Sequence, residues 1–139
     1  MKKIRIKTAL VSVSDKTNLI KLASYFVDNN ILVISSGGTF KYLKKLNPKL
    51  KLIEVSDYTK FNEILDGRVK TLHPIIHAGI LADKNKASRI NQLSHLKTNP
   101  IDLVIVNLYP FEKTINKTSI ETKCIENIDI GGPSLIRGA

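Results

Sequence analysis

The stretch TALVSVSDKTNLIKLASYFVDNNILVISS, residues 8–36, contains two short apolar runs separated by an amphipathic segment. Residues 8–13 and 31–36 are continuous runs rich in β-branched side chains, which is typical of strands buried on both faces of a sheet. Between them, apolar residues recur at helical spacing after a Ser-Asp capping stretch, at Leu19, Leu22, Ala23 and Phe26. The pair Asn29 and Asn30 predicts the end of this helix. A strand, a helix and a second strand in this order predict a right-handed crossover between parallel strands.

The next part of the chain continues this alternation. A turn and a short helix are expected over residues 37–46, and a third strand over residues 51–56. Residues 77–82 are expected to form a strand or an extended segment. Residues 86–97 have the spacing of an amphipathic helix.

The apolar run IDLVIVNLYPF, residues 101–111, predicts the clearest strand of the chain, and Gly131 and Gly132 predict the turn that starts a last helix. A chain of 139 residues has the size of one ordinary domain. We therefore expect one α/β domain over residues 1–139, built on a doubly wound, mainly parallel sheet with helices on both faces.

The composition limits the classes of partner. With 22 basic and 12 acidic residues, the formal net charge is +10, which suits a polyanion or a phosphorylated metabolite. A general lysine bias spread over solvated faces explains the same charge. Aromatic residues do not alternate with basic ones as a single-strand stacking platform requires, so nucleic acid is not the expected partner.

Cysteine usage and hydropathy give the remaining class limits. Cys124 is the single cysteine, so neither a disulfide framework nor a cysteine-based zinc site is expected. The basic N-terminus lacks the pattern of a secretory signal, and no apolar run approaches the length of a membrane span. We expect a cytoplasmic protein without a membrane partner.

Polar motifs follow the predicted strands. SVSDKT (12–17) follows the first, SSGGT (35–39) the second and NLYPF (107–111) the last, while GRVKT (67–71) lies in the long loop after the third. Open parallel sheets bind ligands at the carboxyl ends of their strands, and free N–H groups at a helix start favour phosphate or carboxylate. Together these loops predict a site for a phosphorylated small molecule.

Each motif alone has a structural explanation. Ser14 and Lys16 are compatible with a helix cap and a surface lysine, Tyr109 with a strand end, and Asp129 with a helix cap as readily as with a catalytic carboxylate. His73 and His77 are four positions apart, but Pro74 separates them and no Glu follows His73, so no metal site is expected. Histidines that brace the loop or line the site are the preferred interpretation.

The motifs taken together resemble a known family. SVSDKT, SSGGT, EILDGRVKTLHPIIHAGIL (63–81), IDLVIVNLYPFE (101–112) and ENIDIGGPSLIR (126–137) are similar, in this order, to signatures of the IMP cyclohydrolase domain. That domain is the N-terminal part of a bifunctional purine-biosynthesis enzyme that also carries AICAR transformylase. The resemblance implies a methylglyoxal-synthase-like α/β fold and closure of formyl-AICAR to IMP with loss of water, without a metal or other cofactor.

The resemblance also implies roles for individual residues. The nucleotide, chiefly its 5′-phosphate, would be held by Ser14, Asp15, Lys16, Ser36, Gly37, Gly38, Thr39, Arg68, Val69, Lys70 and Thr71. Val106 and Asn107 would contact the base, with Asp129 and Ile130 on its far side. Lys70 would stabilise the developing oxyanion, Asp129 would orient or deprotonate the carboxamide, and Tyr109 would handle a proton.

Two alternatives and one departure accompany the resemblance. A non-catalytic module that binds a nucleotide or phosphate, and methylglyoxal synthase, would use the same fold. In the family, a lysine that donates or accepts a proton follows the last motif, and this sequence ends at Ala139, before that position. We therefore expect a C-terminally incomplete domain without the transformylase part and with little or no turnover alone. The full-length family member is expected to be a homodimer.

Overall fold

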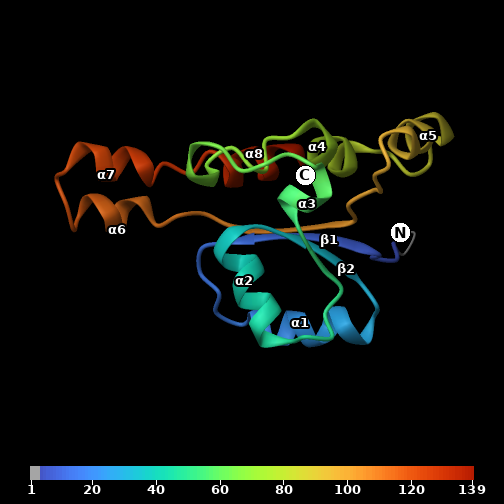
Figure 1. Cartoon of the computed structure of the whole chain (residues 1–139), viewed down its shortest axis with the longest axis horizontal. Coiled ribbons are helices and arrows are strands. Elements are labelled where there is room, and N and C mark those ends of the chain that lie inside the picture. Colours follow the sequence, from blue (N-terminus) through green and yellow to red (C-terminus); the bar gives the residue numbers. More distant parts are fainter. Residues whose placement is uncertain (1–3) are drawn as a thin grey trace.

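A single parallel sheet forms the centre of the computed structural model, which describes residues 4–139 (Figure 1). Its four strands lie in the order β3-β2-β1-β4. Their bounds are Thr8–Val13 for β1, Leu32–Ser35 for β2, Leu52–Glu54 for β3 and Leu103–Asn107 for β4. In the register, Val11 of β1 pairs with Ser35 of β2 and Ile105 of β4. The chain adds strands on one side of β1 and then returns to the other side, so the strand order reverses beside β1.

Helices cover both faces of this sheet (Figure 1). On one face lie α1 (Leu19–Asp28) and α2 (Gly37–Leu46). On the other lie α3 (Val55–Thr59), α4 (Pro74–Leu81), α5 (Ala87–His95) and α8 (Gly131–Gly138). The predicted doubly wound α/β architecture is therefore confirmed.

Two clusters of buried apolar side chains hold the layers together. One lies between the sheet and α1 and α2, around Phe26, Val33 and Leu43. The other lies on the opposite face, where Leu10 and Ile34 of the sheet pack with Ile76 of α4 and Leu135 of α8. Because neighbouring residues of β1 contribute to different clusters, both faces of β1 are buried, as its continuous apolar run predicted.

Several predicted elements match the structure, and others have different bounds. The expected strand over 51–56 was too long, because Val55 begins α3, where its carbonyl accepts a hydrogen bond from Thr59 Oγ1 at 2.8 Å. The Ser-Asp stretch does not cap α1, whose N-cap is Asn18, a left-handed residue without a side-chain cap hydrogen bond. The last strand ends at Asn107, inside the predicted run.

The expectation of a strand or extended segment over 77–82 was wrong, because these residues belong largely to α4. Pro74 occupies the first turn of this helix, and the His73 side chain accepts a hydrogen bond from the Ile75 N–H. The helix is apolar on most of its surface, so its pattern resembles a buried strand. Gly79 allows a close approach, since a Cβ there would lie 3.1 Å from the Asn99 carbonyl oxygen.

Besides α3, two more short helices were not predicted. They are α6 (Phe111–Ile115) and α7 (Glu121–Glu126), which pack against each other and extend beyond the sheet at one end of the molecule (Figure 1). Neither contains a buried residue. We refer to residues 110–127 as the arm.

Candidate functional site

A pocket opens at the carboxyl ends of β1, β2 and β4, where the strand order reverses. The loop around η1 (Leu65–Gly67) and the start of α8 complete its wall. Its lining residues are Ser12, Val13, Ser14, Lys16, Ser36, Gly38, Thr39, Gly67, Arg68, Lys70, Thr71, Asn107, Tyr109, Ile128, Asp129, Ile130, Gly131 and Gly132. The fold therefore brings together loops from distant parts of the sequence at the edge predicted for a ligand.

The loop after β1 is held by the amide of Asn107 at the end of β4. Asn107 Oδ1 accepts hydrogen bonds from the backbone N–H groups of Ser14 at 2.6 Å and Asp15 at 3.0 Å. Its Nδ2 donates to the Asp15 carbonyl at 2.8 Å. The side chain that the resemblance assigns to base contact thus links the end of β4, an edge strand, to the loop after β1. Lys16 extends from this loop, and its Nζ donates to the Ser14 carbonyl.

Asp15 does not line the pocket. Its carboxylate accepts hydrogen bonds from the Thr17 hydroxyl at 2.6 Å and the Thr17 N–H at 2.9 Å. These two bonds, the side-chain one first, lower the pKa of Asp15 below its ordinary value of 3.8. The carboxylate therefore shapes the turn before α1.

The first turn of α2 forms the floor of the pocket at the end of β2. Gly37 adopts a left-handed φ of 52° that other residues disfavour. A Cβ at Gly37 would lie 2.7 Å from Lys70 Nζ, and one at Gly38 would lie 3.8 Å from Lys16 Nζ. Two ammonium groups therefore lie beside the N-terminus of a ten-residue helix, which is itself a favourable place for an anion.

Thr39 has an internal role within the same turn. Its buried hydroxyl donates to the Val13 carbonyl at 2.9 Å and accepts from the Val13 N–H at 3.2 Å. These bonds fix the start of α2 against the end of β1. Thr39 lines the pocket, but its hydroxyl is already hydrogen-bonded.

The loop after α3 supplies two cations. Leu65, Asp66 and Gly67 follow one another with left-handed φ values of 50°, 52° and 79°, which reverse the chain sharply. Lys70 follows this turn, and its Nζ lies 3.2 Å from the Glu63 carboxylate.

Arg68 connects this loop to the end of the arm. Its Nη2 donates to the carbonyls of Ile125 at 3.1 Å and Ile128 at 3.4 Å. Its Nε is buried and has no hydrogen-bond partner among residues 4–139. Because Arg68 lines the pocket, a bound acceptor is one way to satisfy this group.

Asp129 organises the wall opposite these cations. One carboxylate oxygen accepts from the Gly132 N–H at 2.8 Å and the other from the Tyr109 N–H at 3.2 Å. The structural role considered for Asp129 is thus present, since it satisfies a free N–H at the start of α8. Asp129 also lines the pocket, together with Tyr109 and Ile130.

Most of the predicted site residues lie together in this pocket. Four do not line it: Asp15, Gly37, Val69 and Val106. Gly37 still contacts the site through Lys70, whereas Val106 packs against the apolar cluster beneath α8. Six lining residues were not predicted: Ser12, Val13, Gly67, Ile128, Gly131 and Gly132. All six lie within two positions of predicted residues, so extending each predicted set by two residues would have found them.

The two histidines have separate surroundings. His73 caps α4 and its ring lies 5.7 Å from that of Phe61, centroid to centroid. His77 lies beside Gly138 of α8. Within the described part of the chain, no group of three or more His, Cys, Asp or Glu side chains is arranged to hold a metal ion.

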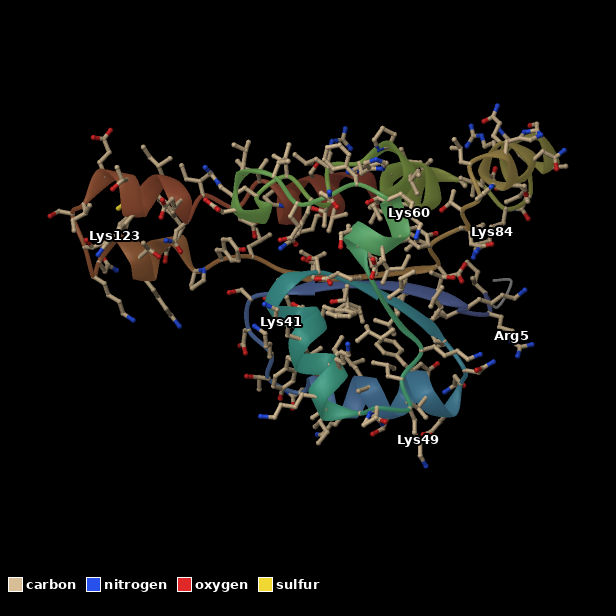
Figure 2. All side chains as sticks on the ribbon, in the orientation of Figure 1. Arg5, Lys41, Lys49, Lys60, Lys84 and Lys123 are labelled. Atoms are coloured by element: carbon tan, nitrogen blue, oxygen red, sulfur yellow. The ribbon has the colours of Figure 1, made fainter. Side chains whose placement is uncertain are left out.

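Positive side chains are clustered in the pocket, whereas they are dispersed over the rest of the surface. Its described lining contains Lys16, Arg68 and Lys70 but a single carboxylate, Asp129. Elsewhere the basic side chains are dispersed, and Figure 2 shows labelled ones on the arm (Lys123), on α2 (Lys41) and near the start of β1 (Arg5). The overall charge of +10 is therefore mostly a property of solvated faces, whereas three cations converge at the pocket.

Comparison with known proteins gives a family and a set of relatives. Residues 18–134 match the family described as the MGS-like domain. The chain is 51% identical over 135 residues to the bifunctional purine biosynthesis protein PurH of Ruminiclostridium cellulolyticum, a match that covers 96% of this chain and 26% of that protein. For the PurH of Lactobacillus acidophilus the identity is 53% over 135 residues, with the same coverage. For that of Prochlorococcus marinus it is 56% over 133 residues, covering 94% of this chain and 25% of that protein.

The chain thus spans about a quarter of the length of these curated relatives. A solved structure described as "Crystal structure of ForH" superimposes with a TM-score of 0.78 at 29% identity, covering 96% of this chain and 67% of that one. Among the described residues, no helix is long and apolar enough to cross a membrane.

Proposed function

Because the chain belongs to the family of MGS-like domains, we propose that its pocket binds a purine nucleotide and closes formyl-AICAR to IMP. The relatives named above are bifunctional purine biosynthesis proteins, and the identity to them extends over nearly the whole chain. This supports a step of purine synthesis in preference to other reactions that the fold accommodates.

The observation that carries the proposal is the convergence of cations on the start of α2. Lys16 and Lys70 lie beside Gly38 and Gly37, and Arg68 lines the same pocket. Free N–H groups at a helix start and adjacent ammonium groups bind a phosphate together, since both favour negative charge. The 5′-phosphate of the nucleotide would occupy this end of the pocket.

The reacting atoms would lie toward Asp129 and Tyr109. In the reaction, the carboxamide nitrogen attacks the formyl carbon, and a C–N bond forms. Water then leaves with the formyl oxygen, one proton from the carboxamide nitrogen and one from the formamido nitrogen. No electrons are transferred, so the chemistry requires proton transfers and stabilisation of the developing oxyanion.

The side chains that line the pocket can supply these functions. Lys70 would stabilise the oxyanion as a positive charge at the pocket, and Asp129 would orient the carboxamide or accept its proton. Tyr109 would transfer a proton during the loss of water. Both reacting groups belong to one substrate, so holding it in a closed geometry provides much of the rate.

The test adds formyl-AICAR to the chain and follows IMP by its absorbance, with Lys70→Ala compared against Lys49→Ala. Lys49 lies outside the pocket, in the turn after α2 (Figure 2). Lys49→Ala therefore removes the same single positive charge as Lys70→Ala without touching the pocket. We expect Lys70→Ala to lower IMP formation by about 10²–10³-fold, the range for loss of one oxyanion-stabilising group, while Lys49→Ala has no effect.

Equal rates for the two variants would contradict the role of Lys70. IMP binding in a calorimeter without any turnover by the unmodified chain would mean that this chain by itself keeps the nucleotide site and not the reaction. Formation of methylglyoxal from dihydroxyacetone phosphate would indicate a methylglyoxal synthase.

A further inference from the structure

Glu63 is not among the residues that line the pocket, but it pairs with Lys70, one of the three cations that do. Glu63 Oε1 is 3.2 Å from Lys70 Nζ, and the side chains are 41% and 22% exposed. Within residues 4–139, a second ion pair joins Lys84 and Asp102 at the opposite end of the sheet. The chain has 22 basic residues, so a carboxylate partner is uncommon for its lysines. The local structure around Lys70 must therefore explain why it is paired.

The sharp turn between the two residues creates this pairing. The Gly67 N–H bonds to the Ile64 carbonyl at 3.0 Å, which folds the chain back so that Glu63 and Lys70 lie on the same side of Gly67. A Cβ at Gly67 would lie 2.8 Å from Lys70 Nζ and 3.2 Å from Glu63 Oε2. The absence of a side chain at this position leaves the space that the ion pair occupies.

The same ammonium group reaches across to α2. A Cβ at Gly37 would lie 2.7 Å from Lys70 Nζ, so the amine is between the turn and the first residue of the helix. Without a ligand, an ammonium beside the positive end of a helix and near Lys16 is electrostatically unfavourable. The Glu63 carboxylate offsets this positive charge.

We propose that Glu63 is the resident counter-ion of Lys70, a positioning residue that holds the amine against the start of α2 until the anionic group of a ligand displaces the carboxylate. The inference rests on the proposed function only in taking an anion as the ligand of the pocket. A lysine side chain has many rotamers, and the ion pair keeps its amine at the place where the anion must bind. Glu63 also competes with that anion, so the pocket favours ligands with enough negative charge to displace it.

The first experiment measures how fast an amine-directed acylating reagent modifies Lys70 in the ligand-free chain, by mass spectrometry of peptides. Glu63→Gln keeps the shape of the side chain and removes its charge. Glu121→Gln, an exposed residue of α7 outside the described ion pairs, removes the same charge elsewhere. We expect acylation of Lys70, normalised to Lys49, to rise about two- to fivefold in Glu63→Gln alone, as for loss of an exposed ion pair. An unchanged ratio would overturn the proposal.

The second experiment titrates inorganic phosphate into the same proteins by calorimetry. Once the carboxylate no longer competes, the dissociation constant for phosphate should fall about two- to fivefold in Glu63→Gln and remain unchanged in Glu121→Gln. Weaker or equal binding in Glu63→Gln would contradict displacement. If the unmodified chain binds no phosphate at all, the proposed function fails, while the acylation ratio still decides the role of Glu63.

Discussion

The Asn107 side chain bonds to the backbone of Ser14, with Oδ1 2.6 Å from the Ser14 nitrogen, and so joins the ends of β4 and β1 beneath the pocket. Parallel strands diverge where their connections leave in opposite directions, and backbone N–H groups in such a loop need acceptors. Asn107 supplies one and also donates to the Asp15 carbonyl. The geometry of the first loop therefore depends on a residue far away in the sequence.

Replacing Asn107 by Ala should lower the free energy of unfolding by about 0.5–1.5 kcal/mol, because the exposed N–H groups of Ser14 and Asp15 exchange their protein acceptor for water. The measurement is urea denaturation followed by circular dichroism. Asn107→Asp, which keeps the acceptor oxygens, should recover part of the loss. An Ala variant as stable as the unmodified chain would show that water replaces the amide without cost.

How far the sequence predicted the structure depends on whether the signal is local. The run at Thr8–Val13 was predicted with correct bounds, because a strand buried on both faces is apolar throughout. A uniformly apolar run also led to the wrong prediction at α4, because an apolar helix and a buried strand have similar patterns. The arm was missed because α6 and α7 bury no residue and therefore lack an apolar period.

For the site, sequence order predicted which loops meet but not how their side chains are bonded. Residues that follow β1, β2 and β4 came together because all parallel strands end at one edge. The internal hydrogen bonds of Thr39 and the pairing of Lys70 with Glu63 depend on atomic positions in the folded chain. No pattern in the sequence records them.

Arg68 should hold the end of the arm against the pocket. Arg68→Gln removes the hydrogen bonds to the carbonyls of Ile125 and Ile128, so the arm should open more often. A loss of about 1 kcal/mol of local stability corresponds to about fivefold faster cleavage by trypsin at arm lysines. Arg89→Gln on α5 is the control: like Arg68→Gln it removes one arginine and its trypsin site, but it should leave cleavage of the arm unchanged. Equal cleavage in both variants would show that other contacts hold the arm.

Gly79 is packed so closely that a side chain there should force its neighbours to shift. A Cβ there would lie 3.0 Å from Ile101 Cγ1 and 3.1 Å from the Asn99 carbonyl oxygen, so Gly79→Ala should destabilise the chain by about 1–3 kcal/mol. Gly38→Ala is the matched control, since its Cβ would meet Lys16 Cε at an ordinary 3.8 Å within a helix. Thermal unfolding of both variants makes the comparison, and similar melting temperatures would refute the packing argument.

The turn at Asp15 should respond to pH through Thr17. The Thr17 hydroxyl is the largest cause of the lowered pKa of Asp15, so Thr17→Ala should raise this pKa toward 3.8. Because the folded pKa lies below the ordinary one, the turn is stabilised above pH 3.8 and loses this contribution as pH falls through the folded pKa. An NMR titration of the Asp15 carboxyl carbon measures this pKa in the unmodified chain and in Thr17→Ala. Asp83, whose pKa is lowered by its own bonds to Asn85, should titrate as before.

The last helix tests whether the site depends on the apolar cluster beneath it. Leu135 is fully buried, whereas its neighbour Ile136 is 53% exposed. Leu135→Ala should lower the free energy of unfolding by about 2–5 kcal/mol through the cavity it leaves, and Ile136→Ala should change it by less than about 0.5 kcal/mol. Because the start of α8 carries Gly131 and Gly132 in the pocket wall, Leu135→Ala should also weaken IMP binding at a temperature where it remains folded. Urea denaturation and calorimetry measure the two effects. Weakened binding in Ile136→Ala but not in Leu135→Ala would mean that the exposed face of α8, and not its anchoring, governs the site.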